Sequence, residues 1–188
     1  MDYAAARRSM VENQIRTNRV TDPLVIAAMS ELPRELFLPP TSRGIAYVDD
    51  DVPLGNGRFL MEPLVAARLL QLAEIGPSDV VLEVGANVGY LSAVIARLAS
   101  AVLALESDAE LAKRARAALA ELAINTVTVV EGDPGLGYPR QAPYDVIVIN
   151  GAVTRVPEPI LDQLNEGGRL VAVVVGEDGV GRGTLHLR

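Results

Sequence analysis

The chain has 188 residues, of which 49% are hydrophobic and 22% charged, and its formal net charge is -7. This length suits one domain with a full hydrophobic core, and the composition excludes a disordered protein. The acidic balance argues against a nucleic-acid partner, because binding phosphates requires a surplus of lysine and arginine.

The N-terminal part is predicted to be mainly helical. Apolar residues at helical spacing indicate a helix over Ala4–Thr17, and we interpret its Arg7-Arg8 pair as solvated surface. A second helix is expected after Asp22, an N-cap residue followed by Pro23 at the first helical position, and should end near Ser30. Its apolar stripe is predicted to be Leu24, Ala27 and Ala28.

Residues 41–62 are predicted to be a long connection, because glycines and prolines such as Gly55 and Pro53 break regular structure there. Connections of this length are usually functional or mobile. Its acidic triplet Asp49-Asp50-Asp51 favours solvated surface over a divalent-cation site, since three adjacent aspartates cannot all face one ion. Helical periodicity returns over Pro63–Ala73.

From Pro77 onward, strands and helices are predicted to alternate. Nearly all-apolar strands in such an alternation are typical of a parallel sheet that is covered on both faces. The predicted strands are Val80–Val84, Val102–Leu105, Thr126–Val130, Asp145–Asn150, Leu170–Val175 and a weaker Thr184–Arg188, and the predicted helices are Tyr90–Leu98, Asp108–Ala123 and Pro157–Leu164.

Acidic residues stand at the ends of three successive predicted strands. Glu83 precedes a glycine-bearing turn, and Glu106 ends the next apolar run, where a carboxylate can bind the ribose hydroxyls of an adenosine cofactor. Asp133 follows the third strand and suits the adenine amino group. Alternatively, Glu106 is a surface acid that caps the following helix, and the glycine turn joins strand to helix without a ligand.

The turn itself helps to choose the cofactor. A nicotinamide dehydrogenase is disfavoured, because Asn87 interrupts the G-x-G-x-x-G pattern. An E/D-x-G-x-G-x-G pattern, typical of S-adenosylmethionine sites, fits better: Glu83 suits the methionine amino group, and asparagine tolerates the positive φ of the middle glycine place. The predicted cofactor-binding residues are Glu83, Gly85, Ala86, Asn87, Gly89, Glu106, Ser107, Asp133 and Pro134.

Strings along nearly the whole chain resemble the protein-L-isoaspartate O-methyltransferase family. Residues 10–16, 20–23, 27–29 and 32–39 resemble its N-terminal segment, and residues 46–49 and 52–57 resemble its substrate-side loop. Residues 132–133, 137–139, 142–145 and 161–171 follow its later pattern. Generic cofactor folds share the glycine turn but not these strings, so the family resemblance covers far more than the cofactor site.

The resemblance implies an S-adenosylmethionine-dependent O-methyltransferase of the protein-repair type, with a carboxylate of a protein or peptide as acceptor. An ionised carboxylate is already a nucleophile, so catalysis would come from alignment of the reactants. The sequence agrees, because it has no cysteine and one histidine, His186. We therefore expect no catalytic side chain and no metal site.

The implied fold class is α/β, a Rossmann-like, doubly wound, mostly parallel sheet of the class I methyltransferase type with an N-terminal helical segment. We expect one domain over residues 1–188: residues 1–75 form the helical and substrate-side segment, and residues 76–188 form the cofactor-binding core. The chain stops early for the family at Leu187-Arg188, which predicts a missing closing strand and an open sheet edge.

The chain departs from the family at Gly57-Arg58-Phe59-Leu60-Met61, where the family reads glycine, glutamine, threonine, isoleucine and serine. Met61 replaces the serine that hydrogen-bonds the acceptor, a loss of about 1.5–3 kcal/mol, and Glu62 adds a negative charge beside it. Arg58 is either a replacement anchor for a carboxylate or solvent-facing. The apolar run Phe59-Leu60-Met61 keeps an alternative open, a cofactor-binding or protein-interaction module without transferase activity.

Three further expectations concern partners and location. Nucleic-acid methylation is disfavoured, because Ile149-Asn150-Gly151-Ala152 lacks the proline–aromatic pair that stacks a flipped base. No signal-peptide pattern and no bilayer-length apolar stretch is found, which indicates a cytoplasmic protein without a membrane partner. The sequence leaves the oligomeric state open.

Overall fold

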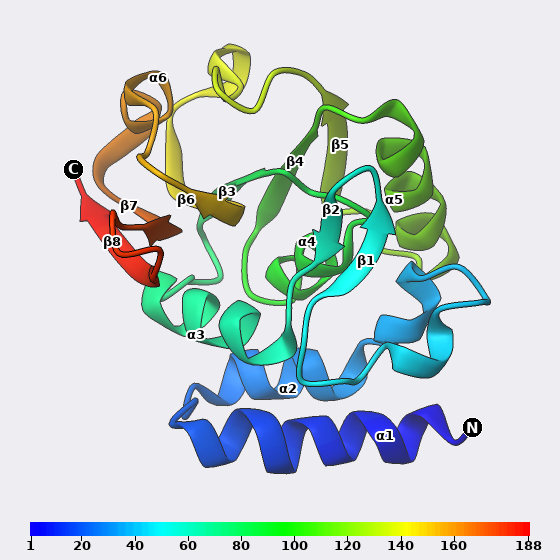
Figure 1. Cartoon of the computed structure of the whole chain (residues 1–188). Helices are drawn as coiled ribbons and strands as arrows, with labels where there is room; N and C mark the ends of the chain where they lie inside the picture. Colours follow the sequence, from blue (N-terminus) through cyan, green and yellow to red (C-terminus); the bar gives the residue numbers. More distant parts are fainter.

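A six-stranded sheet forms the centre of the computed structural model, which describes residues 1–188 (Figure 1). The strand order is β5-β4-β3-β6-β7-β8, and every neighbouring pair is parallel except β7 and β8. The predicted mostly parallel α/β sheet is therefore confirmed. The strands are β3 (Val80–Val84), β4 (Ala101–Glu106), β5 (Val127–Glu131), β6 (Tyr144–Val153), β7 (Leu164–Val175) and β8 (Gly181–Leu187).

Helices α1 and α2 lie together as a layer beside this α/β core (Figure 1). Helix α1 continues through two helical turns, η1 (Val11–Ile15) and η2 (Arg16–Asn18), which confirms the predicted first helix. Asp22 caps α2 as predicted, since its Oδ1 accepts the N–H of Leu24 at 2.8 Å. The helices are α1 (Tyr3–Met10), α2 (Pro23–Glu31), α3 (Pro63–Ala73), α4 (Tyr90–Ile95), α5 (Ala109–Glu121) and α6 (Glu158–Leu161), and the remaining turns are η3 (Arg34–Phe37), η4 (Arg43–Ile45) and η5 (Pro139–Gln141).

The two faces of the sheet carry separate hydrophobic cores. Successive strand residues point to opposite faces, so Val81 packs with the larger core and Leu82 with the smaller one. Helices α1 to α5 contribute to the larger core, whereas α6 is the helix that contributes to the smaller. This packing fixes the strands and leaves their carboxyl ends to build a site.

The stripe predicted for α2 is wrong in two of its three residues. Leu24 is 54% exposed and Ala27 is exposed, whereas Ala28 is buried with its neighbours. Apolar residues lie on all sides of this helix, so the spacing of apolar residues in the sequence could not identify its buried face. The buried residues of α2 are Val25, Ile26, Ala28 and Met29.

The predicted long connection over residues 41–62 contains regular structure. It includes η4 and a hairpin of β1 (Val52–Gly55) and β2 (Arg58–Leu60). The turn runs through Gly55, Asn56 and Gly57, with φ values of 98°, 51° and 70°. Asn-Gly is a strong hairpin signal, so the prediction of a connection without strands is wrong for residues 52–60. The acidic triplet before it is exposed, and no cluster of acids or histidine is placed to hold a metal ion.

The weaker strand predicted over Thr184–Arg188 is confirmed as β8, an antiparallel edge strand on β7, with Leu170 opposite His186. Three smaller predictions need correction. The last predicted helix is shortened to α6, and the strand predicted at Leu170 already begins at Leu164. Arg7 is not simply solvated, because its Nε donates to the Tyr47 hydroxyl at 2.9 Å. No helix is long and apolar enough to cross a lipid bilayer.

Candidate active site

The site lies where the strand order reverses, because β3 pairs with both β4 and β6. In open parallel sheets, ligands bind outside the carboxyl ends of the strands at this point. The turn after β3 is tied to β4 by the N–H groups of Gly85 and Ala86, which donate to the Leu105 carbonyl at 2.8 and 3.0 Å. Asn87 adopts a left-handed conformation there, with φ of 54°. This confirms the positive φ predicted for the middle glycine place of the pattern.

Glu106 ends β4 with a completely buried carboxylate. Its Oε1 accepts the N–H groups of Ser107 and Asp108 at 2.8 and 2.9 Å. Its Oε2 accepts the N–H of Asn87 at 2.6 Å and Nη2 of Arg58 at 2.6 Å. A buried charge needs such donors, because transfer from water without them is costly. Glu106 is therefore held in one orientation at the edge of the site.

Arg58 reaches this carboxylate from β2. Its Nε also donates to Oδ1 of Asn87 at 3.0 Å, and its side chain is 28% exposed. The interpretation of Arg58 as solvent-facing is therefore wrong. The β1–β2 hairpin, which was not predicted, places this arginine against the turn after β3.

Glu83 is fully buried behind the site and lines neither of the cavities described below. It accepts a hydrogen bond from the Ser92 hydroxyl and another from Nδ2 of Asn150 at 2.8 Å. Burial raises the pKa of Glu83 to about 7, against the lowering effect of these two hydrogen bonds. In this structure Glu83 orients Asn150.

Two adjoining cavities occupy the strand ends. The smaller, of about 290 Å³, has apolar walls that include Val84, Ile149 and Ile160. The larger, of about 730 Å³, lies between β2, α3 and the ends of β6, β7 and β8. The residues that line both cavities are Arg58, Asn150, Gly151 and Ala152.

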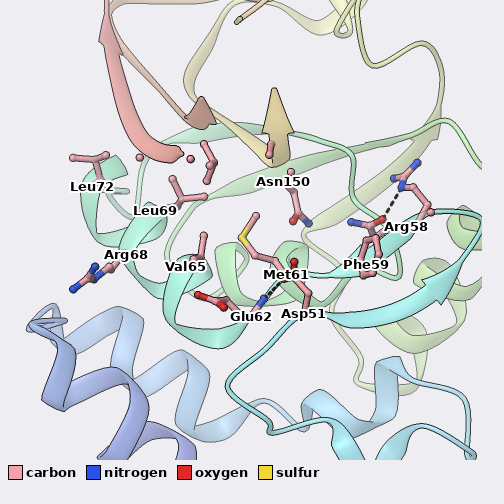
Figure 2. A pocket seen from close by; sticks show the side chains of 17 residues that line it. Asp51, Arg58, Phe59, Met61, Glu62, Val65, Arg68, Leu69, Leu72 and Asn150 are labelled. Atoms are coloured by element: carbon pink, nitrogen blue, oxygen red, sulfur yellow. Dashed lines mark hydrogen bonds between the residues drawn. The ribbon is translucent and has the colours of Figure 1, made fainter. Parts of the chain in front are cut away.

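The larger cavity has an apolar wall with charges at its rim. Figure 2 shows Met61 between Val65 and Asn150, with Arg58 and Arg68 on opposite sides of the cavity. Glu62 lines it as well, and partial burial, followed by the charge of Asp51, raises the pKa of Glu62. No hydroxyl side chain lines the cavity, so no other side chain there replaces the serine that the resemblance implies at position 61.

The structure brings part of the predicted set together. Gly85, Ser107 and Pro134 line the smaller cavity, and Asn87 lines the larger one. Glu106 lines neither cavity, but its carboxylate pairs with Arg58, which lines both.

The other predicted residues lie outside the cavities. Ala86 is buried beneath the turn. Gly89, with φ of 86°, packs against α5, since a Cβ there would stand 3.0 Å from that of Ala115. Asp133 is exposed and accepts the N–H of Gly135 at 2.7 Å.

Sequence reasoning missed the contribution of β6. Asn150 and Gly151 line both cavities, and the backbone oxygen of Asn150 would lie 3.3 Å from a Cβ on Gly85. The strand order could have found them, because the strand on the other side of the reversal point must also end at the site.

Comparisons with known proteins agree with this geometry. Residues 5–181 match the sequence model of the protein-L-isoaspartate(D-aspartate) O-methyltransferase family. The protein-L-isoaspartate O-methyltransferase of Methanoregula boonei is 44% identical over 170 residues, which are 90% of this chain and 78% of the relative. That of Methanoculleus marisnigri is 43% identical over 168 residues, 89% of this chain and 76% of the relative.

Solved structures show the same fold. A protein-L-isoaspartate O-methyltransferase superposes with a TM-score of 0.82 at 27% identity, covering 97% of this chain and 60% of that one. A putative protein-L-isoaspartate O-methyltransferase from Plasmodium falciparum, solved with S-adenosyl-L-homocysteine, superposes with a TM-score of 0.81 at 20% identity. That match covers 95% of this chain and 88% of the other.

Proposed function

Because the chain belongs to the protein-L-isoaspartate(D-aspartate) O-methyltransferase family, we propose that it methylates the carboxylate of isoaspartyl residues in proteins or peptides. The membership confirms the prediction of an S-adenosylmethionine-dependent methyltransferase. It gives no support to the alternative of a module without transferase activity. The proteins or peptides that serve as acceptor are part of the proposal.

The smaller cavity suits the adenosine part of the cofactor. Its volume is close to the lower limit of ordinary ligand pockets, and apolar walls with a few polar groups are typical of such pockets. Val84, Ile149 and Ile160 offer the apolar surface that a flat base requires. We propose that Gly85, Ser107 and Pro134 hold the adenosine, with Glu106 for the ribose hydroxyls and Asn87 beside it.

One observation carries the proposal: the two cavities meet at Asn150 to Ala152, at the carboxyl end of β6. A cofactor in the smaller cavity and an acceptor in the larger one would place their reacting ends at this junction. When bound, S-adenosylmethionine supplies a methyl group on a sulfonium, which an ionised carboxylate attacks without a general base. The protein's contribution is therefore alignment, and Glu83 serves it by fixing the Asn150 amide.

The first test is binding and transfer with the full chain. Titration calorimetry with S-adenosylhomocysteine should show binding, and Glu106→Gln should weaken it about 10- to 100-fold, the effect of hydrogen bonds lost from a charged group. Glu131→Gln is the matched control, because Glu131 lies opposite Glu106 at the end of β5 but is exposed and paired with Arg116. Equal weakening in both variants would contradict the assigned role of Glu106.

The second test identifies the acceptor. Labelled methyl transfer should occur to a peptide with an isoaspartyl residue and not to its aspartyl isomer. Absence of cofactor binding at high micromolar concentration would refute the proposed function. Binding without transfer to the isoaspartyl peptide would leave the cofactor assignment intact and refute the acceptor.

A further inference from the structure

Arg58 stands at the boundary between the two cavities. It lines both of them, its Nη2 lies 2.6 Å from Oε2 of Glu106, and its Nε lies 3.0 Å from Oδ1 of Asn87. The Arg58–Glu106 pair thus joins the proposed ribose site to the larger cavity. The resemblance implies glutamine at this place, and glutamine cannot form this ion pair.

The hydrogen-bonding capacity of Glu106 is already filled. A carboxylate offers about four lone-pair sites, two on each oxygen. Four N–H donors within 2.9 Å occupy them, from Ser107, Asp108, Asn87 and Arg58, and the Ser107 hydroxyl lies a longer 3.4 Å from Oε1. A ribose hydroxyl can donate to Glu106 only where one of these donors leaves.

Arg58 is the donor that can leave. The other three are backbone N–H groups in the turns after β3 and β4, and the first of these turns is fixed by hydrogen bonds to the Leu105 carbonyl. Arg58 is a long side chain with part of its surface in solvent, and it follows a hairpin turn. Ribose binding and the Arg58 contact therefore compete for Oε2 of Glu106.

The larger cavity gives the released guanidinium a function. Met61 and Phe59 offer no hydrogen-bond donor, and the side-chain amide of Asn150 already donates to Glu83. The other lining cation, Arg68, is exposed, lies on the opposite side of the cavity and donates from Nε and Nη2 to the Asn18 carbonyl at 3.3 and 3.1 Å (Figure 2). Arg58 is the lining cation that also reaches the proposed cofactor cavity, and its fork of donors suits an acceptor carboxylate.

We propose that Arg58 is a latch that leaves Glu106 when the cofactor's ribose binds and then anchors the acceptor carboxylate in the larger cavity. This proposal rests on the proposed function. It makes binding ordered, cofactor before acceptor, because the acceptor's anchor is engaged with Glu106 until the cofactor is in place. It also means that the latch lowers cofactor affinity, since the binding-competent arrangement is a fraction of the free protein.

Calorimetry on the full chain tests the latch. Arg58→Gln restores the family residue and should bind S-adenosylhomocysteine about tenfold more tightly than the unmodified protein, because no ion pair must open. Arg58→Lys keeps the charge but not the fork of donors. Its affinity for S-adenosylhomocysteine should lie between those of Arg58→Gln and the unmodified protein. Arg116→Gln, which removes an exposed arginine paired with Glu131, should leave the affinity unchanged. Thermal unfolding of each variant confirms that it is folded.

A second titration tests the anchor. An isoaspartyl peptide should bind the unmodified protein measurably only with saturating S-adenosylhomocysteine, and Arg58→Gln should bind it weakly with or without the cofactor product. Unchanged peptide affinity in Arg58→Gln would overturn the anchor. Equal or weaker cofactor binding by Arg58→Gln would overturn the latch and leave the proposed function standing. Absence of cofactor binding in every protein would refute the proposed function, and the latch with it.

Discussion

The two halves of the site are built in different ways. In the cofactor half, the backbone donors to Glu106 come from one, two and nineteen residues away in the sequence. In the acceptor half, Arg58 arrives from 48 residues away. The larger cavity is also lined by Leu69 of α3 and Gly183 of β8, and a Cβ on Gly183 would lie 3.9 Å from Cδ2 of Leu69. One half is encoded in strand-end turns, whereas the other is assembled by tertiary packing.

The difference shows where specificity can change. Backbone N–H groups keep their positions through side-chain substitution, so the donors to Glu106 in the cofactor half depend on backbone geometry rather than on residue type. The acceptor half consists of side chains such as Met61 and Phe59, which a single substitution alters. A chain can therefore keep the methyl donor and change what it methylates. Each of the following predictions separates the two halves.

The largest effect is expected at Arg34, which ties the acceptor half to the rest of the molecule. Fully buried, it donates from Nε to the Ala46 carbonyl and from Nη2 to the Met61 carbonyl, both at 2.7 Å, and its guanidinium lies 4.8 Å from the centre of the Tyr90 ring. Arg34→Met should lower the free energy of unfolding by about 3–5 kcal/mol, because two hydrogen bonds from a charged group are lost.

Denaturant unfolding measures this loss. Arg97→Met, at an exposed arginine, is the control and should change stability by less than about 0.5 kcal/mol. In the folded protein, Arg34→Met should impair peptide binding more than S-adenosylhomocysteine binding. Equal impairment of both would mean that the two halves are not separable.

The next effect is a pH dependence in the cofactor half. The pKa of Glu83 rises from 4.5 to about 7 on folding, so the native state holds a proton that the unfolded chain has lost. The stability that this proton contributes is present below pH 4.5 and is lost as the pH rises through 7. Between pH 4 and pH 8 the loss amounts to about 3 kcal/mol.

Glu83→Gln removes this titration. The difference in unfolding free energy between Glu83→Gln and the unmodified protein should move by about 3 kcal/mol in favour of the variant from pH 4 to pH 8. Glu131→Gln, at an exposed acid, should show a far smaller change. A difference that stays constant with pH would show that the pKa of Glu83 is the same in the folded and the unfolded protein.

The same contrast explains what the sequence could predict. The sheet, the turn after β3 and the place of Glu106 follow from local patterns, and each was predicted. Gly89 shows the limit of a glycine pattern, because a left-handed glycine serves close ligand approach and close helix packing alike. Its place in the cofactor site stays a prediction, and the 3.0 Å between a Cβ built on Gly89 and that of Ala115 shows that packing against α5 also requires glycine. The hairpin that carries Arg58, and the part of β6 at Asn150, needed the neighbours of each strand, which the pattern along one chain does not contain.

A smaller effect, on activity, is expected at Met61. Met61→Ser places a hydroxyl in the acceptor half where the sequence resemblance implies one, and a hydrogen bond to a charged carboxylate contributes about 1.5–3 kcal/mol. The kcat/KM for an isoaspartyl peptide should rise about 10- to 100-fold, while the affinity for S-adenosylhomocysteine stays the same. Met61→Leu is the apolar control. An equal kcat/KM in the two variants would show that the acceptor lies elsewhere in the cavity.

The smallest effect is expected at Asp51, where the hairpin segment meets α3. Its Oδ1 accepts the N–H of Glu62 at 2.8 Å, and Glu62, the N-cap of α3, makes no capping bond with its own side chain. Asp51 therefore acts as a cap from outside the helix. Asp51→Ala should lower the unfolding free energy by about 0.5–1 kcal/mol relative to Asp49→Ala, which removes an equal charge and no such bond. Because α3 carries Leu69, loss of this cap should weaken peptide binding slightly and leave cofactor binding unchanged. A change in cofactor affinity instead would mean that the start of α3 supports both halves of the site. Arg58 would then not mark the boundary between the cofactor half and the acceptor half.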